Sequence, residues 1–288
     1  MADIRGIKLR TEGIKKILKV TSAMQIVAAT KLKRAEERAL KSRFYVKALG
    51  EILAKISIQD GFLKEKAFSE SASESGLCLL AVCSERGLCG GFNAGIFKKV
   101  EEHAAAPGLK ILPVGKKGFI HFKRKKLNLI SDIKPEKDEP LDSFTGRIAS
   151  FLLKEFYKGS IRKISIVYNM FRQHSLGTVV AKQVLPIIQD LLSGRAEEEK
   201  NKNTYKALYL YEPDIEILSK HILEEYLESF ISGAILESRA SEEMARMLAM
   251  KYATDNGNEL LSALTLQYHK LRQANITREI IEVAGAGI

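Results

Sequence analysis

The sequence predicts two long terminal helices that pair as an antiparallel coiled coil, with a central Rossmann-like α/β domain whose sheet is mostly parallel. Three observations lead to this fold. Both ends of the chain repeat apolar residues at the coiled-coil period, the two ends carry opposite net charge, and the middle alternates short apolar runs with helical stretches. The expected bounds are residues 1–60 and 214–288 for the paired helices and 70–210 for the central domain.

The N-terminal segment is predicted to be one uninterrupted helix. It contains no proline from Ile4 to Ile58, and its apolar residues recur at an average step of about 3.5 residues, the heptad period of a left-handed supercoil. At 1.5 Å per residue this helix would be roughly 75 Å long, which is more than a compact domain requires. The predicted seam consists of Ile7, Ile14, Ile17, Val20, Met24, Ala28, Leu32, Ala35, Ala39, Val46, Leu49, Leu53 and Ile56.

The C-terminal segment shows the same pattern after Pro213, with no later proline. Its stripe consists of Ile215, Leu218, Ile222, Tyr226, Phe230, Leu236, Ala240, Met244 and Leu248, and after a gap of Leu261, Leu264, Tyr268 and Leu271. The gap holds the sequence TDNGN at 254–258, where Asn-Gly favours a turn. A glycine inside a helix costs about 1 kcal/mol, so the residues alone leave open whether the helix breaks there.

Charge supports pairing of the two ends. Residues 1–50 carry 13 Lys and Arg against 4 Asp and Glu, a net charge of +9, whereas residues 214–288 carry 7 against 12, a net charge of −5. Neither helix can bury its stripe alone, but each can bury the other's. If the middle domain brings its own ends together, the two helices run antiparallel.

The middle of the chain has the pattern of a three-layer α/β domain. Helical stretches at about 93–105 and 142–157 lie between its first three apolar, β-branched runs, and strands that alternate with helices favour a parallel sheet. Residues 193–204 are polar and are expected to form a loop. The four predicted strands are Leu77–Cys83, Ile111–Val114, Ile164–Tyr168 and Thr178–Ala181.

Two patterns raise the question of catalysis. The run Gly87–Gly91 follows a predicted strand and precedes a helix, where phosphate loops lie, but it lacks the Gly-Lys-Ser/Thr ending of a Walker loop and the spacing of a dinucleotide fold. A tight turn is the simpler interpretation. Cys89 is a candidate nucleophile at a helix N-terminus. The five histidines are scattered, however, and none lies in a recognisable partner motif.

The remaining features limit cofactors and location. Cys78, Cys83 and Cys89 are spaced five and six residues apart, which does not match a zinc site, so free thiols and no cofactor are expected. No window approaches the ~18 consecutive apolar residues of a membrane span. The N-terminus has neither a secretion signal nor a long Ser-rich transit peptide, which predicts a soluble protein of a reducing compartment.

The N-terminal helix carries a basic stripe, which consists of Lys31, Lys33, Arg34, Arg38, Lys41 and Arg43. It suits an acidic protein partner, and a coiled-coil hairpin that grips nucleic acid phosphates is the alternative. The stripe lacks interleaved aromatic residues and any base-reading motif. At the other end, residues 283–288 are small and uncharged, as in a frayed tail or a tip that turns inside an apolar sleeve.

Four stretches together resemble one family, the gamma subunit of F-type ATP synthase. They are Thr21–Ala35, Ser84–Asn93, Tyr209–Asp214 and Ala240–Ile281, and they keep the family's order and spacing along the chain. The resemblance implies a central rotor shaft without catalytic residues, placed inside a ring of α and β subunits. It implies further contacts with the epsilon subunit and the membrane c-ring, a peripheral position on the cytoplasmic side of the inner membrane, and a helix that continues through the Asp-Asn-Gly stretch. With no transit peptide, a bacterial enzyme is the simplest source, although a mature organellar chain would look similar.

The resemblance also implies contact residues. Met24 and Cys89 match positions that face the acidic lever loops of β, and Arg272 and Gln273 match a pair that hydrogen-bonds a catch loop near the top of the shaft. Tyr209 belongs to the region that meets the c-ring and epsilon. Glu85 and Asn258 depart mildly from the usual Asp and Gly, and both changes concern turn chemistry rather than these contacts.

Overall fold

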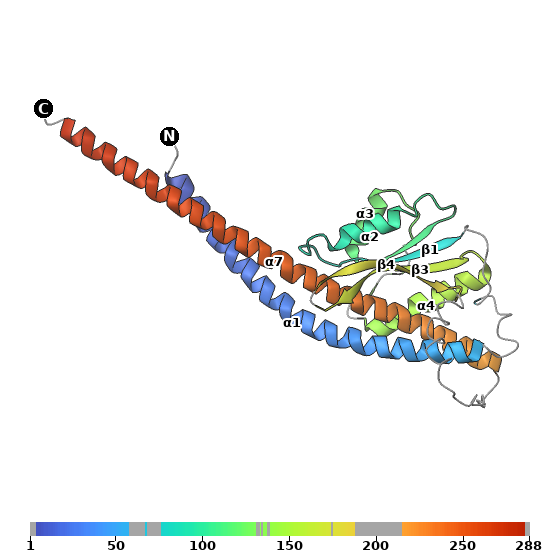
Figure 1. The fold of residues 1–288 in the computed structure, drawn as a ribbon. Coiled ribbons are helices and arrows are strands. Elements are labelled where there is room, and N and C mark those ends of the chain that lie inside the picture. Colours follow the sequence, from blue (N-terminus) through green and yellow to red (C-terminus); the bar gives the residue numbers. More distant parts are fainter. Residues whose placement is uncertain are drawn as a thin grey trace, which may run out of the picture. The chain divides into compact units, whose positions relative to one another are not determined.

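The computed structural model describes residues 4–57, 67, 76–130, 133, 135–136, 139–173, 175–187 and 215–285. They form two compact units, one from residues 1–30 and 244–288 and the other from 31–243. The two longest helices, α1 and α7, each contribute to both units (Figure 1). The elements in chain order are α1 (Ile4–Ser57), β1 (Leu77–Val82), α2 (Phe92–Glu101), β2 (Lys110–Val114), α3 (Lys116–Arg124), α4 (Leu141–Lys158), β3 (Lys163–Arg172), β4 (Ser175–Leu185) and α7 (Ile215–Gly285).

The unit of residues 31–243 is built on a four-stranded sheet with the order β2-β1-β3-β4. Strand β1 pairs parallel with both β2 and β3, and β3 pairs antiparallel with β4. The β3 and β4 strands are longer than the apolar runs that predicted them, because the hairpin continues through polar residues such as Asn169 and Gln183 and through further apolar ones. The predicted fold class, terminal helices around a mostly parallel sheet, is confirmed.

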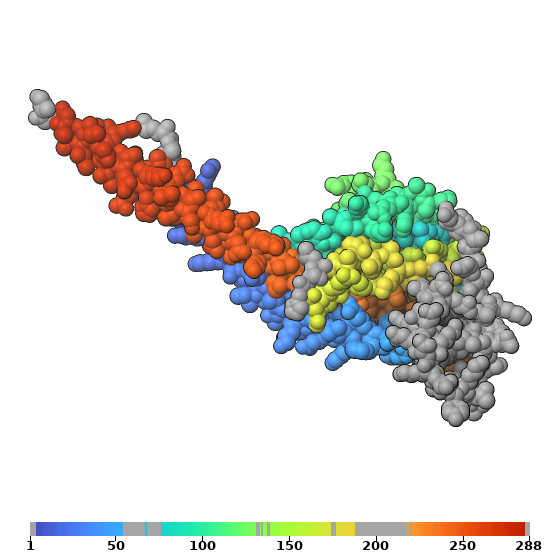
Figure 2. Space-filling model, in the orientation of Figure 1, coloured from blue at the N-terminus to red at the C-terminus, as the bar shows by residue number. Residues whose placement is uncertain are grey.

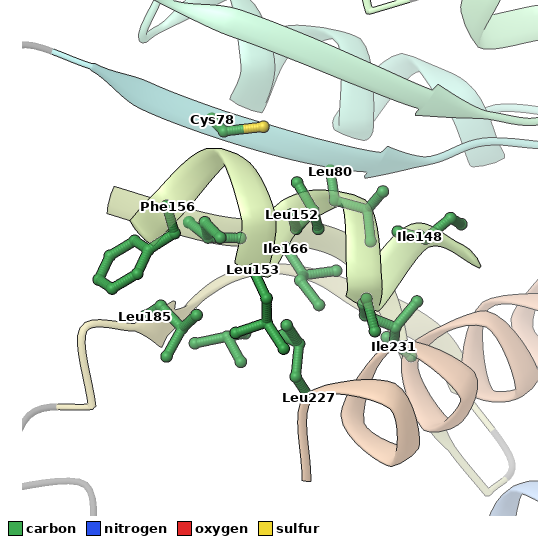
Figure 3. Packing of buried hydrophobic residues seen from close by; sticks show 14 of the residues in the cluster. Cys78, Leu80, Ile148, Leu152, Leu153, Phe156, Ile166, Leu185, Leu227 and Ile231 are labelled. Carbon is green, nitrogen blue, oxygen red and sulfur yellow. The ribbon is translucent and has the colours of Figure 1, made fainter. Parts of the chain in front are cut away.

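One face of the sheet packs on α4 and on the first part of α7, and this contact forms the main core. Alternate strand residues such as Cys78, Leu80 and Ile166 point to that face because successive side chains of a strand alternate (Figure 3). They meet Leu152 of α4 and Leu227 of α7, and all five are fully buried. The opposite face is covered by α2 and α3 (Figure 1).

Helix α3 was not predicted from the sequence. Its nine residues carry two lysines at the start and a lysine and an arginine at the end, and this polarity hid a short amphipathic helix that buries Gly118 and Phe122. Gly115 precedes it with a φ of 101°, and a Cβ at that position would collide with the backbone of Cys83. A glycine is therefore required where the chain turns from β2 into α3.

The unit of residues 1–30 and 244–288 is an antiparallel pair of helices. Thr254 Oγ1 donates a hydrogen bond to Thr21 Oγ1 at 2.8 Å, and Gly257 lies opposite Leu18. Helix α7 is continuous through 254–258, so the turn that Asn-Gly favours locally does not form. The seam position of Gly257 explains this outcome, because a Cβ there would lie 2.7 Å from Leu18 Cδ2 and the glycine lets the two helices approach closely.

The heptad period predicted for α1 is confirmed, but its frame differs near the N-terminus. Leu18 and Thr21 lie in the seam, whereas Ile17 and Val20, which we expected there, are 61% and 56% exposed. The seam advances in alternating steps of four and three residues and accepts threonine and glutamine at some positions. A frame chosen from apolar residues alone therefore shifts by one residue, and Ile17 and Val20 lie beside the seam on open surface.

The same two helices also contact each other in the unit of residues 31–243. A Cβ at Gly233 of α7 would lie 2.9 Å from Ser42 Oγ and 3.5 Å from Val46 Cγ2 of α1. Tyr45 Oη donates to Glu225 Oε1 at 3.0 Å. Higher numbers in α1 therefore face lower numbers in α7, which is the antiparallel pairing that the sequence predicted.

Candidate functional site

The Gly-rich turn after β1 is held by side-chain hydrogen bonds between Ser84 and Asn93. The Ser84 N–H donates to Asn93 Oδ1 at 3.0 Å, and Asn93 Nδ2 donates back to Ser84 Oγ at 2.7 Å. Leu88 adopts a φ of 62°, in the left-handed region that a leucine rarely occupies. The Leu88 side chain lies on the surface, where it is 61% exposed.

Cys89 lies on the inner side of this turn and is 3% exposed. Its Sγ lies 3.7 Å from Ser84 Oγ and 3.7 Å from Asn93 Nδ2. Within the described part of the chain, the hydrogen-bond partners of Cys89 are Ser84, Arg86 and Asn93, and no histidine or carboxylate is among them. The surface of the turn is formed instead by Glu85, Arg86 and Leu88, and Leu88 is the apolar residue that sequence reasoning missed.

The other predicted contact residues lie in the two-helix unit. Met24 is half-buried beside the seam of α1, whereas Arg272 and Gln273 are both exposed on α7. Leu271, directly before them, is the last half-buried residue of the seam, and residues 272–285 are exposed throughout. The sequence could have located the end of the half-buried seam, because the apolar heptad pattern of α7 stops at Leu271.

The structure does not bring Met24 together with the pair Arg272 and Gln273. Thr21 is bonded to Thr254, so Met24 lies just beyond that contact in one direction, while Arg272 lies 18 residues away along α7 in the other. At 1.5 Å per residue the axial separation is roughly 30 Å. Met24 and the pair therefore belong to two separate contact levels. Tyr209, the fifth predicted residue, lies outside the described residues.

The basic stripe of α1 divides into two parts. Lys31, Lys33, Arg34, Arg38 and Lys41 are exposed. Arg43 instead turns inward and donates from Nε to Glu237 Oε1 at 2.7 Å. This hydrogen bond raises the pKa of the Arg43 guanidinium, and partial burial opposes the shift. The stripe that remains free for a polyanionic partner is therefore shorter than the sequence suggested.

The three cysteines are free and buried, as expected of thiols without a structural bond. Burial raises the pKa of the Cys78 thiol to about 12 and raises that of Cys83 further, so both stay protonated at neutral pH. Among the residues that the structure describes, no cluster of three His, Cys, Asp or Glu side chains has metal-binding geometry. No helix within the same residues is long and apolar enough to cross a bilayer.

Comparison with known proteins gives a consistent family. A family model described as ATP synthase matches residues 3–287. An ATP synthase gamma chain of Stenotrophomonas maltophilia (strain K279a) is 34% identical over 296 residues, covering 99% of this chain and 98% of the relative. The gamma chain of Chlorobaculum parvum is 36% identical over the same shares of both chains.

Solved structures of ATP synthases resemble this chain in fold. A chain of the central stalk and c-ring structure of the Tetrahymena thermophila mitochondrial ATP synthase is 27% identical with a TM-score of 0.61, over 81% of this chain and 99% of that one. A chain of the Euglena gracilis mitochondrial enzyme, at 19% identity, has a TM-score of 0.67 over 98% of this chain and 93% of its own length, and supports the fold. With a family match and curated relatives along nearly its whole length, the chain belongs to the gamma-subunit family of F-type ATP synthase.

Proposed function

We propose that this chain is the central-stalk rotor of an F-type ATP synthase, and that it couples proton-driven rotation of a c-ring to conformational cycling of the catalytic β subunits. It supplies no catalytic residue of its own, binds no cofactor and acts by transmitting torque. The family match carries the assignment of the subunit. The physical argument for a shaft is the two-helix unit.

The two-helix unit has the surface of a rod that turns inside a sleeve. Its seam buries one stripe of each helix, yet large apolar side chains remain exposed beside the seam, a surface that normally marks a protein contact. The C-terminal part of α7, in red, shows its side chains openly in Figure 2. The exposed apolar residues of this unit are Leu9, Ile17, Val20, Ile26, Val27, Tyr252, Leu260, Leu266, Ile276, Ile280, Ile281 and Val283.

The proposed partners are the α and β subunits of the catalytic ring, the epsilon subunit and the membrane c-ring, and nucleic acid is not among them. Met24 and the turn of Cys89 would face the acidic levers of β, with Leu88 as the exposed member of that turn. Arg272 and Gln273 would hydrogen-bond the catch loop, and Tyr209 would lie near epsilon and the c-ring. The central stalk and c-ring named for the Tetrahymena relative support the c-ring contact.

The proposed location is the cytoplasmic face of the inner membrane, where the chain is peripheral and part of the ATP synthase complex. The exposed basic stripe of α1 supports an acidic protein partner, and its lack of interleaved aromatic residues disfavours nucleic acid. The buried Cys89, without a bonded base, disfavours an enzyme of its own.

Purification under mild conditions tests the proposal. A tagged copy of the chain, expressed in its native cell, should be recovered with α and β subunits in an assembly that hydrolyses ATP. Nucleic acid binding by the tagged chain should be weak at physiological salt. Recovery of the chain alone, or with nucleic acid and without α and β, would reject the rotor. A Cys89→Ser variant that assembles and retains ATP hydrolysis would reject the cysteine enzyme.

A further inference from the structure

An ion pair between a partly exposed arginine and a buried carboxylate links both long helices to the sheet. Arg43 of α1 donates from Nε to Glu237 Oε1 of α7 at 2.7 Å, and the Glu237 side chain is 10% exposed. Glu237 follows the apolar Ile235 and Leu236 along the helix, an unusual place for a carboxylate. Sequence reasoning assigned Arg43 to the surface stripe and passed over Glu237.

The pair binds the backbone of one strand residue. The register between β3 and β4 shifts between Met170 and Arg172, so Phe171 is left out of the β4 ladder. Its N–H donates to Glu237 Oε2 at 3.3 Å, and its carbonyl accepts a hydrogen bond from Arg43 Nη2. Carboxylate and guanidinium thus replace the partners that an irregular ladder fails to provide.

Two serines extend the same face of α7 along the sheet. Ser238 Oγ donates to the Val82 carbonyl at 3.4 Å, and Ser241 Oγ donates to the Asn169 carbonyl at 3.2 Å. Both serines are buried. One helical stretch, residues 237–241, is therefore hydrogen-bonded to the ends of two neighbouring strands, β1 and β3.

These bonds add directional resistance to the apolar packing that already holds α7 on the sheet. A partly exposed ion pair adds little net stability, and apolar residues of similar volume would hold the helix about as well. Apolar packing holds the helix through the shapes of interlocking side chains, but its contacts are not directional. Hydrogen bonds to fixed backbone atoms hold both the register and the rotation of α7.

We propose that Arg43, Glu237, Ser238 and Ser241 form a torsional clamp through which torque passes between the sheet and the two long helices. The proposal rests on the rotor function proposed above and names the residues that make the rotor stiff at this level. They are positioning residues, because none of them is expected to touch nucleotide. Arg43 contributes through the several N–H donors of its guanidinium, which hydrogen-bond to Glu237 and to the Phe171 carbonyl at the same time.

Torsional stiffness of the assembled complex tests the clamp. The catalytic ring is immobilised and stalled, and a bead is attached to the sheet unit through a Lys98→Cys substitution on the exposed part of α2. The native cysteines are buried and should not compete for the label. In the Glu237→Gln variant the variance of the bead's angle should at least double, while ATP hydrolysis by the unloaded complex should stay at the level of the parent protein.

Matched variants separate a clamp from a merely structural role. Glu51→Gln makes the same chemical change in the exposed pair Lys47–Glu51 of α1 and should leave the angular variance unchanged. Arg43→Lys keeps the charge but loses the guanidinium and should give an intermediate variance. If Glu237→Gln prevents assembly, Ser241→Ala is measured instead, with the same expected direction.

An angular variance equal to that of the parent protein in an assembled Glu237→Gln or Ser241→Ala complex overturns the clamp. Equal softening by Glu51→Gln would do so as well, because a surface pair has no bond to the sheet. Failure of the unmodified chain to assemble with α and β is a different result. It rejects the rotor function itself, so the two failures are distinguishable.

Discussion

Helix α7 has two different environments along one uninterrupted helix. In its first part, Leu223, Leu227, Ile231 and Ile235 are almost completely buried in the core of the sheet unit. In its last part, beyond Met250, Leu264 is the one residue of the described helix that falls in the buried class. The first part is therefore held by this chain's own core, and the second by a single seam and, in the proposed function, by partner subunits.

This contrast explains how α7 can both anchor the sheet unit and contact partner subunits in the proposed function. A well-packed core fixes the position of its side chains and does not tolerate changes in volume. A two-helix seam with open flanks leaves room for side chains to move aside. The sheet unit is thus expected to be rigid and sensitive to substitution, whereas the two-helix unit tolerates substitution in the isolated chain and shows its requirements in the complex.

The largest expected difference is between Leu227→Ala and Leu260→Ala. Leu227 is fully buried, so its truncation should lower the free energy of unfolding by about 2–5 kcal/mol through lost burial and a residual cavity. Leu260 is 51% exposed, and its truncation should change that free energy by less than about 0.5 kcal/mol. Urea unfolding of the purified chain, followed by tyrosine fluorescence and far-ultraviolet circular dichroism, measures both. Similar values for the two variants would remove the contrast.

A smaller difference in the free energy of unfolding is expected between alanine substitutions at two crowded glycines, Gly177 and Gly257. A Cβ at Gly177 of β4 would lie 2.5 Å from Ser241 Oγ and 2.7 Å from the Met170 carbonyl oxygen. Backbone cannot move aside easily, so Gly177→Ala should destabilise the chain by about 1–3 kcal/mol.

Gly257→Ala provides the matched control in the seam. Its Cβ would meet Leu18 Cδ2, the far end of a flexible side chain. Rotation of Leu18 offsets the clash, and alanine gains about 1 kcal/mol of helix propensity, so the net change should be near zero. Thermal unfolding of both variants checks the pair. A larger loss at Gly257 than at Gly177 would mean that the seam is as rigid as the core.

The sequence predicted the fold class because it is carried by patterns repeated over many residues. The heptad period of α1 and α7 and the four apolar runs of the sheet stay recognisable when a single residue departs from the pattern. The frame of the seam near Ile17 and the continuity of α7 at Gly257 depended on contacts with the other helix, which local propensity does not contain. Tertiary packing overrode the local turn signal at Asn256-Gly257.

Less of the candidate site than of the fold could be predicted from the sequence. Matching motifs supplied the predicted contact residues, and the structure gives the exposure of four of them, while their contacts stay a prediction. The inward direction of Cys89 and the exposure of Leu88 follow from turn geometry, which a motif does not specify. The clamp around Glu237 depends on a register shift at Phe171, and such shifts leave no clear mark in a single sequence.

The smallest effect on stability, and a large one on activity, is expected for the double variant Arg272→Ala and Gln273→Ala. Both side chains are exposed on α7 beyond the last seam residue, so their loss should change the free energy of unfolding by less than about 0.5 kcal/mol. In the complex, removal of hydrogen bonds from a charged donor should weaken the contact by about 1.5–3 kcal/mol and lower ATP turnover. Assembly, steady-state ATP hydrolysis and unfolding are measured on the same preparation.

Tyr252→Ala, which removes another exposed side chain of α7, is the control for a general effect of surface truncation. Unchanged turnover in the assembled double variant would show that this level of the shaft needs no specific contact. Loss of folding in the isolated chain would show that the last part of α7 depends on its own residues and not on its partners.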